Sequence, residues 1–260
     1  MLTIGVDLAA EAQRTAAAGI EWTDGSARLT SLAVGIDDVQ IVALAQGADV
    51  VAIDCAFGWP AEFVAFVSAH ERGEMSPRSL SGRDWRRRLA YRHTDRAVRE
   101  VTGRWPLSVS TDRLGMTAMH CAELLAAFEA AGERIDRSGA GRLVEVYPAA
   151  ALRLWGVQTA GYKTQPDARM RAAESLLGLA PWLDVDDGQR DLLGRSDDAL
   201  DALAASLNAR AHALGHTLPV PDELRPAAQT EGWIALPTAP LDSLTSRSNS
   251  SASISATHSS

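Results

Sequence analysis

Lysine and cysteine are almost missing from this sequence of 260 residues. Lys163 is its single lysine, and Cys55 and Cys121 are its two cysteines. Two cysteines without C-x-x-C spacing indicate neither a disulfide framework nor a thiolate metal site, and they fit a reducing cytoplasm, where we expect the protein. No apolar run reaches the roughly 18 residues that a membrane span needs, and Asp7 precedes any stretch of signal-peptide length. We therefore expect no membrane association.

The composition is that of a globular protein with a sizeable core. Hydrophobic residues make up 46% of the chain and charged residues 22%, which excludes disorder throughout. A chain of this length favours a single large domain, which we place at residues 1–237 with an insertion at about 60–140. Residues 238–260 are rich in serine and lack an apolar period, so we expect a disordered tail there.

Basic residues are few overall but concentrated in one segment. The formal net charge of −8 argues against a nucleic-acid binder that is basic over its whole surface. Residues 72–104 nevertheless hold ten arginines against four acidic residues. This local excess of positive charge predicts a contact surface for an anionic partner, or simply a solvated face.

Hydrophobic periodicity predicts an α/β fold that begins β-β-β-α-β. Residues 2–8 alternate as a strand, residues 15–22 and 27–34 form a hairpin, and residues 36–46 have helical spacing. The near-continuous apolar run at 48–54 is typical of a parallel strand buried on both faces. Further along the chain we expect a strand at 143–147 and helices at 118–131, 149–155, 167–177 and 198–214.

Three of the expected strands carry an acidic residue where an apolar one would be cheaper to bury. Asp7 and Asp54 close their strands, and Glu145 lies within a third. An unpaired buried carboxylate costs several kcal/mol, so these acids need compensation. Because ligands of α/β sheets gather at the carboxyl ends of strands, a divalent cation is one candidate. The alternatives are a turn at Asp7, a helix cap at Asp54 and an arginine partner for Glu145.

The last helix brings more acidic residues to the same region. Asp197 and Asp198 fall in its first turn, where acids commonly cap a helix and face its dipole. Asp201 lies beyond that turn, at the edge of the buried face, so capping does not explain it. Together with the strand acids it completes a set of oxygen ligands of the kind that Mg²⁺ or Mn²⁺ prefers.

At these residues the chain resembles the family catalogued as domain of unknown function 429, whose members are predicted nucleases with a ribonuclease-H-like fold. The matching pieces, in family order, are Gly5-Val6-Asp7, Ile53-Asp54 with Gly58-Trp59-Pro60, Arg92-His93-Thr94-Asp95-Arg96, Glu145-Val146-Tyr147-Pro148, Lys163 and the run from Asp197 to Leu203. The chain departs from the common family pattern at Cys55-Ala56-Phe57 and at Tyr147, where histidine is frequent.

The resemblance implies a five-stranded mixed sheet, with its first three strands antiparallel, flanked by helices. Its last-helix piece also looks like that of Holliday-junction resolvases, which implies that Asp7, Asp54 and Asp198 or Asp201 are metal ligands. We accordingly expect two-metal hydrolysis of phosphodiester bonds, with Asp7 bridging the ions and Asp54 and Asp201 binding one each. Asp198 and Glu145 would be secondary ligands or would position water.

The remaining predicted site residues concern the substrate, which we expect to be DNA or RNA. Lys163 would neutralise transition-state charge, unless it is only a solvated surface residue. Arg92 and Arg96 would contact phosphates, with Asp95 orienting one of them, and we prefer this pair to the arginines at 86–88. Two other functions remain open. One is a catalytically silent nucleic-acid-binding or scaffold protein, and the weaker one is an ATP-dependent phosphotransferase of the actin and sugar-kinase type.

Overall fold

A mixed six-stranded sheet forms the centre of the molecule in a computed structural model that describes residues 1–75, 82–111 and 114–246. The strand order is β5-β4-β1-β2-β3-β6. The strands are β1 (Leu2–Asp7), β2 (Ala16–Thr23), β3 (Ser26–Val34), β4 (Val50–Asp54), β5 (Leu143–Glu145) and β6 (Leu183–Asp184). We predicted five strands; the sixth, β6, has two residues and so shows no alternation that the sequence could reveal.

The pairing confirms that the first three strands are antiparallel. β1 pairs with β2, and β2 with β3 through a tight turn whose Gly25 has a φ of 77°, a conformation that glycine adopts without strain. β4 then pairs parallel to β1, and β5 parallel to β4. The register places Asp7 directly beside Asp54, so the two carboxyl ends of β1 and β4 coincide.

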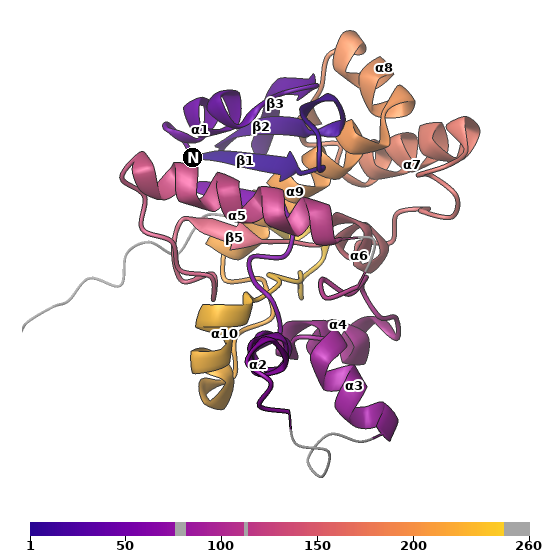
Figure 1. Ribbon diagram of the computed structural model, residues 1–260. Coiled ribbons are helices and arrows are strands. Elements are labelled where there is room, and N and C mark those ends of the chain that lie inside the picture. Colours follow the sequence, from indigo (N-terminus) through magenta and orange to yellow (C-terminus); the bar gives the residue numbers. More distant parts are fainter. Residues whose placement is uncertain (76–81, 112–113, 247–260) are drawn as a thin grey trace, which may run out of the picture.

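Helices cover both faces of the sheet (Figure 1). On one face α1 (Asp38–Ala45) and α5 (Gly115–Ala130) pack against apolar side chains of β1 and β4. On the other face α9 (Asp197–Ala213) lies across β1, β2 and β4, with α6 (Pro148–Leu154), α7 (Pro166–Leu179) and α8 (Asp187–Arg195) beside it. β4 is therefore buried on both faces, as its apolar run predicted.

Strand alternation decides which face each side chain of β1 and β4 meets. Ile4 and Val6 of β1 pack toward α1 and α5, so Thr3, Gly5 and Asp7 face α9. Thr3 Oγ1 lies 2.9 Å from Ser206 Oγ of α9, which fixes the helix along the strand. A Cβ at Gly5 would overlap the backbone of α9 at Ala202 and Ser206. The missing side chain therefore allows α9 to lie directly on β1.

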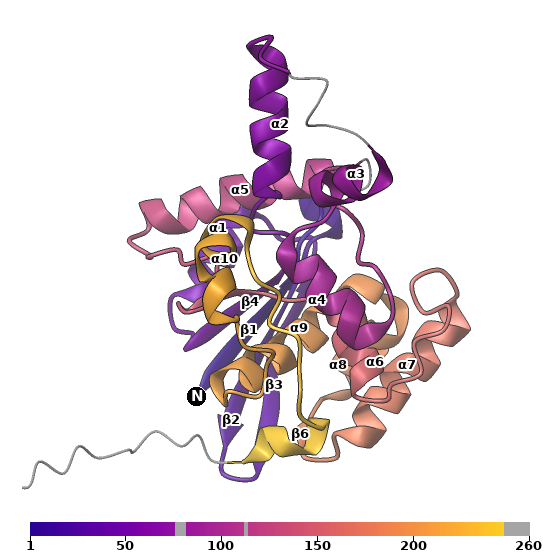
Figure 2. The same cartoon turned by 90° about the horizontal axis from the view of Figure 1, so that it is seen from below.

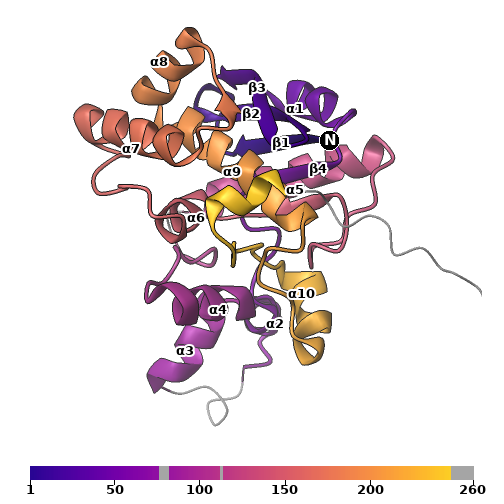
Figure 3. The same cartoon turned by 180° about the vertical axis from the view of Figure 1, so that it is seen from behind.

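Three helices of the predicted insertion form an arm outside the layered core. The arm consists of α2 (Ala61–Glu71), α3 (Gly82–Ala90) and α4 (His93–Thr102), and α10 (Arg225–Glu231) lies beside it (Figures 1 and 3). Figure 2 shows α2 projecting away from the sheet. The fourth helix of the predicted insertion, α5, instead packs on the sheet as part of the core.

The C-terminal segment is ordered further than the sequence suggested. Leu241–Thr245 form a short 3₁₀ helix whose Leu241 and Leu244 are buried against the core that includes α9. The prediction of a disordered tail from residue 238 is thus wrong for residues 238–246, and the rest of that tail lies outside the described residues. Within the described part, no helix combines the length and the apolar character that a membrane crossing requires.

Candidate metal centre

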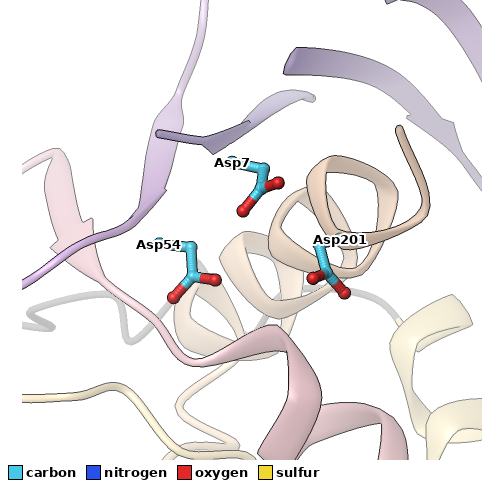
Figure 4. Close-up of side chains that lie close together, drawn as sticks. All are labelled: Asp7, Asp54 and Asp201. Carbon is cyan, nitrogen blue, oxygen red and sulfur yellow. The ribbon is translucent and has the colours of Figure 1, made fainter. Parts of the chain in front are cut away.

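Three aspartate side chains converge at one edge of the sheet. Asp7 ends β1, Asp54 ends β4 and Asp201 lies in the second turn of α9. One carboxylate oxygen from each residue lies within 4.8 Å of the other two (Figure 4). Asp201 is buried, whereas Asp7 and Asp54 are half-buried. The cluster has the donor atoms and the spacing to hold a metal ion.

The fold brings these residues together for reasons that lie in the sequence. β1 and β4 are parallel neighbours, so their carboxyl ends meet at the same edge. Asp7 and Asp54 also share the strand parity of Gly5 and Ala52, which directs both side chains toward α9. Because Gly5 lets α9 approach β1 closely, the Asp201 side chain reaches the same space from α9.

Asp201 is held by two neighbouring residues of the loop before α7. Lys163 Nζ lies 2.6 Å from Asp201 Oδ2, and the Tyr162 hydroxyl donates to Asp201 Oδ1 at 2.8 Å. The side chain of Lys163 is 49% exposed, whereas that of Asp201 is 1% exposed. Lys163 was predicted near the centre and lies there, whereas nothing in the sequence pattern singled out Tyr162.

The aspartate cluster carries more negative charge than its surroundings neutralise. Burial, together with repulsion from Asp201 and Asp54, raises the pKa of Asp7 well above its usual range. Burial, opposed by Lys163 and reinforced by Asp201, raises the pKa of Asp54 to about 7. Burial also raises the pKa of Asp201, although Lys163 and Tyr162 oppose it. One lysine therefore does not balance three carboxylates, and added positive charge would stabilise the cluster.

Asp198 lies close to this cluster but is engaged elsewhere. Its two oxygens accept from Arg14 Nε at 2.8 Å and Nη2 at 2.7 Å, a bidentate pair. The adjacent Asp197 lies 3.3 Å from Arg169 Nη2. The N-cap of α9 is Ser196, which accepts from the Ala199 amide, so the two acids do not cap the helix. Asp198 thus sits beside the three converging aspartates without joining them.

Glu145 does not join the cluster either, because it belongs to a buried ion cluster around Arg92. Five hydrogen bonds, matching the five guanidinium donors of Arg92, go to Glu145, Asp95 and the Glu231 carbonyl at 2.7–3.3 Å. Arg92, Asp95 and Glu145 are all buried. Strand alternation also turns Glu145 to the face opposite Val144 and α9. Of the alternatives, the arginine partner is the one found for Glu145.

This geometry corrects the predicted substrate contacts of Arg92 and Asp95, whereas that of Arg96 stays a prediction. Arg92 has no donor left and is 4% exposed, and Asp95 uses both oxygens on Arg92, so neither residue is placed to meet a substrate. Arg96 is half-buried and donates to the Tyr91 carbonyl at 3.2 Å. Sequence patterns also missed Glu231, whose carboxylate accepts from the amides of Ala61 and His93, since 138 residues or more separate these partners.

Comparison with known proteins adds one decisive observation. The family model described as protein of unknown function (DUF429) matches residues 5–225. The chain belongs to the DUF429 family. No curated protein and no solved structure matches it. The DUF429 match includes Asp7, Asp54, Lys163 and Asp201, so the whole centre lies inside the family region, whereas Glu231 lies beyond its end.

Proposed function

We propose that this DUF429 protein is a metal-dependent nuclease that hydrolyses phosphodiester bonds at the centre formed by Asp7, Asp54 and Asp201. The observation that carries the proposal is the convergence of the three carboxylates within 4.8 Å at the carboxyl ends of two adjacent parallel strands. The carboxyl edge of an α/β sheet is where such folds place their ligands.

The residues present fit a hard divalent cation. All three converging groups are carboxylates, and oxygen ligands are those that Mg²⁺ and Mn²⁺ prefer. Burial and the neighbouring carboxylates raise the pKa values of Asp7 and Asp54, and a bound cation would favour the ionised form of both. We therefore assign Asp7, Asp54 and Asp201 as the ligands. Asp198 is left out of the set because both of its oxygens bind Arg14.

The chemistry divides between the metal and the chain's own residues. Bound Mg²⁺ or Mn²⁺ would supply Lewis-acid stabilisation of phosphoryl charge and an activated water. Tyr162 and Lys163 fix the carboxylate of Asp201 through separate oxygens, which keeps that ligand oriented. The half-exposed Lys163 side chain also places a positive charge beside Asp201, where it would attract a phosphoryl oxygen and stabilise the charge developing on it.

The topology supports a ribonuclease-H-like assignment as part of the same proposal. Three antiparallel strands are followed by two parallel ones, and a long helix near the end of the chain crosses the sheet behind them. The acids lie at the ends of the first and fourth strands and on that helix. This agrees with the resemblance from which the nuclease hypothesis began.

The proposal is tested by cleavage of a panel of single-stranded, duplex and branched DNA and RNA with Mn²⁺ or Mg²⁺. We expect Asp7→Asn and Asp201→Asn to lose activity by about 100-fold or more, because each removes a charge that holds the metal. The control is Asp222→Asn, an exposed aspartate that pairs with Arg225, which should cleave like the native chain. Equal cleavage by all four proteins would expose a contaminating nuclease and contradict the proposal.

Metal binding is measured separately from cleavage. Millimolar Mn²⁺ should raise the melting temperature of the native chain and of Asp222→Asn, because a ligand that binds only the folded state stabilises it. The increase should be absent in Asp7→Asn. Stabilisation by metal without cleavage of any substrate would favour a catalytically silent nucleic-acid-binding protein instead.

A further inference from the structure

The α3 helix carries an exposed row of arginines that the metal centre does not use. Arg83, Arg86 and Arg87 occupy positions i, i+3 and i+4 and therefore share one side of the helix, and all three are exposed. The fourth arginine, Arg88, is directed elsewhere, because its Nε donates to Glu62 of α2 at 3.0 Å. We call Arg83, Arg86 and Arg87 the arginine row.

Among the residues that the structure describes, the arginine row has little neutralisation by acidic side chains. Asp84 is the one acidic residue in α3, and its carboxylate lies 3.7 Å from Arg87 Nη1 with 90% of the aspartate side chain exposed. An exposed pair at this distance contributes little binding energy. Because the chain as a whole has a net charge of −8, a polyanion is repelled by most of the surface and attracted here.

An aromatic pair, with Tyr91 half-buried and Trp105 exposed, follows this row along the chain. Tyr91 directly follows α3, and its amide donates to the Arg87 carbonyl at 3.0 Å. Its ring stacks on Trp105 with the centroids 4.1 Å apart. Trp105 is 37% exposed, so part of this indole remains open to solvent. Exposed arginines together with an accessible indole are a combination that binds unpaired bases, with phosphates on the cations and a base on the ring.

The arm that carries these residues is anchored next to the metal centre. Arg92, two residues beyond α3, is bound by Glu145, which pairs in register with Ile53, the neighbour of Asp54. On the other side, α2 begins seven residues after Asp54, and the Ala61 amide donates to Glu231. A ligand that binds to α3 would therefore lie on an arm that is anchored beside the carboxyl end of β4.

We propose that the arginine row of α3 and the indole of Trp105 form the binding surface for a single-stranded nucleic acid. This inference rests on the proposed nuclease function and names its substrate class. It replaces Arg92 and Arg96, the phosphate contacts expected from the sequence, with arginines that are exposed.

Binding is measured in EDTA, so that no metal-dependent cleavage occurs, by the fluorescence anisotropy of a labelled 16-nucleotide single strand at increasing NaCl. The native chain should show a slope of log K against log salt of about −2, since three phosphates contribute roughly 0.7 each. The triple variant Arg83→Gln/Arg86→Gln/Arg87→Gln should lose most of that slope. At low salt it should bind the single strand at least about tenfold more weakly than the native chain does. Trp105→Leu should weaken single-strand binding without changing the slope.

The matched control is Arg171→Gln/Arg190→Gln/Arg195→Gln, which removes the same charge from exposed positions on α7 and α8 and should bind like the native chain. Equal loss in both triple variants would overturn the inference, because net charge alone would then explain binding. Tighter binding of a duplex, or of labelled polyglutamate, would also overturn it.

The failure of this inference is distinguishable from failure of the proposed function. Hydrolysis of bis(p-nitrophenyl) phosphate with Mn²⁺ needs the aspartates but no arm, so the arginine-row variant should retain it. If the native chain hydrolyses this small diester but binds no strand, the inference is wrong and the nuclease chemistry stands. If the strand binds through the arginine row but neither substrate is cleaved, the binding surface stands and the nuclease function fails.

Discussion

Among single residues, Asp54 shows most clearly how the clustered carboxylates lower the stability of the metal-free protein. Its carboxylate lies beside Asp7 in register and near Asp201, with Lys163 as the nearby cation. Burial and these neighbours raise its pKa to about 7 from an ordinary value of 3.8. The folded state therefore holds a proton on Asp54 in a pH range where the unfolded chain has released it.

The sign of the resulting pH dependence follows from linkage. A carboxyl whose pKa is raised on folding stabilises the protein fully below the unfolded pKa, near 4, and this contribution is lost as the pH rises through about 7. In EDTA, the free energy of unfolding of the native chain should thus fall between pH 5 and pH 8. Asp54→Asn, which cannot ionise, should fall less and be more stable than the native chain at pH 8 by a few kcal/mol at most.

Urea unfolding at pH 5 and pH 8 measures this difference. Asp222→Asn is the control, because it makes the same substitution at an exposed aspartate outside the cluster. An Asp54→Asn variant that loses as much stability as the native chain between the two pH values would contradict the prediction.

Residue by residue, the sequence revealed the centre better than its surroundings. Asp7 and Asp54 stand out because a strand pattern is interrupted by an acid, and Asp201 because capping does not account for it. Asp198 and Glu145 look the same in sequence, yet each is bound by an arginine, and the partners lie 184 and 53 residues away. Local patterns do not encode such pairs. An arginine partner for Glu145 was one of the alternatives, but its identity as the buried Arg92 and the pairing of Asp198 with Arg14 could not be predicted.

At the scale of elements, the position of α9 on β1 decides whether Asp201 reaches the other two aspartates. Gly5 is the residue that permits this approach, because a Cβ there would overlap backbone atoms of Ala202 and Ser206. The Thr3 and Ser206 hydroxyls fix the helix along the strand. Periodicity predicted both elements, but their separation depends on a single missing side chain, which periodicity does not reveal.

Gly5→Ala should therefore destabilise the protein by about 3 kcal/mol or more, since the overlap is with backbone and cannot be relieved by a rotamer change. Its matched control is Gly178→Ala in α7, where a Cβ meets open space and the change should be neutral or stabilising by up to about 1 kcal/mol. Urea unfolding followed by circular dichroism compares the two. A loss below about 1 kcal/mol in Gly5→Ala would show that α9 does not rest on β1 as described.

At the scale of the whole molecule, the arm must keep a fixed orientation on the core if a nucleic acid bound to α3 is to reach the metal centre. The layered core carries the aspartates, and the arm carries the arginine row of α3. Their connection is partly apolar, through Val98 of α4 and Ala150 of α6, and partly polar: Arg92 at the start of α4 binds Glu145 of β5 and the Glu231 carbonyl of α10. Such a cluster is directional, so it sets the orientation of the arm more strictly than apolar packing would.

Removing the centre of this cluster should loosen the arm. Arg92→Met leaves Asp95 and Glu145 buried without their cation, which should cost about 3–5 kcal/mol of stability. Amide hydrogen exchange should accelerate across α3 and α4 more than in the strands, because the lost contacts join those helices to the sheet. Arg96→Met, which removes one hydrogen bond from a half-buried arginine, is the control and should cost less than about 1.5 kcal/mol.

Unpaired charge and lost packing are separated by a triple variant. Arg92→Met/Asp95→Asn/Glu145→Gln removes the cation together with both carboxylates, so it leaves no buried ion without a partner. If desolvated charge causes the loss in Arg92→Met, the triple variant should recover part of the stability although it has fewer native side chains. Recovery of stability without recovery of slow exchange in α3 and α4 would show that the cluster serves mainly to orient the arm. A triple variant less stable than Arg92→Met would contradict the charge argument and assign the loss to hydrogen bonding and packing.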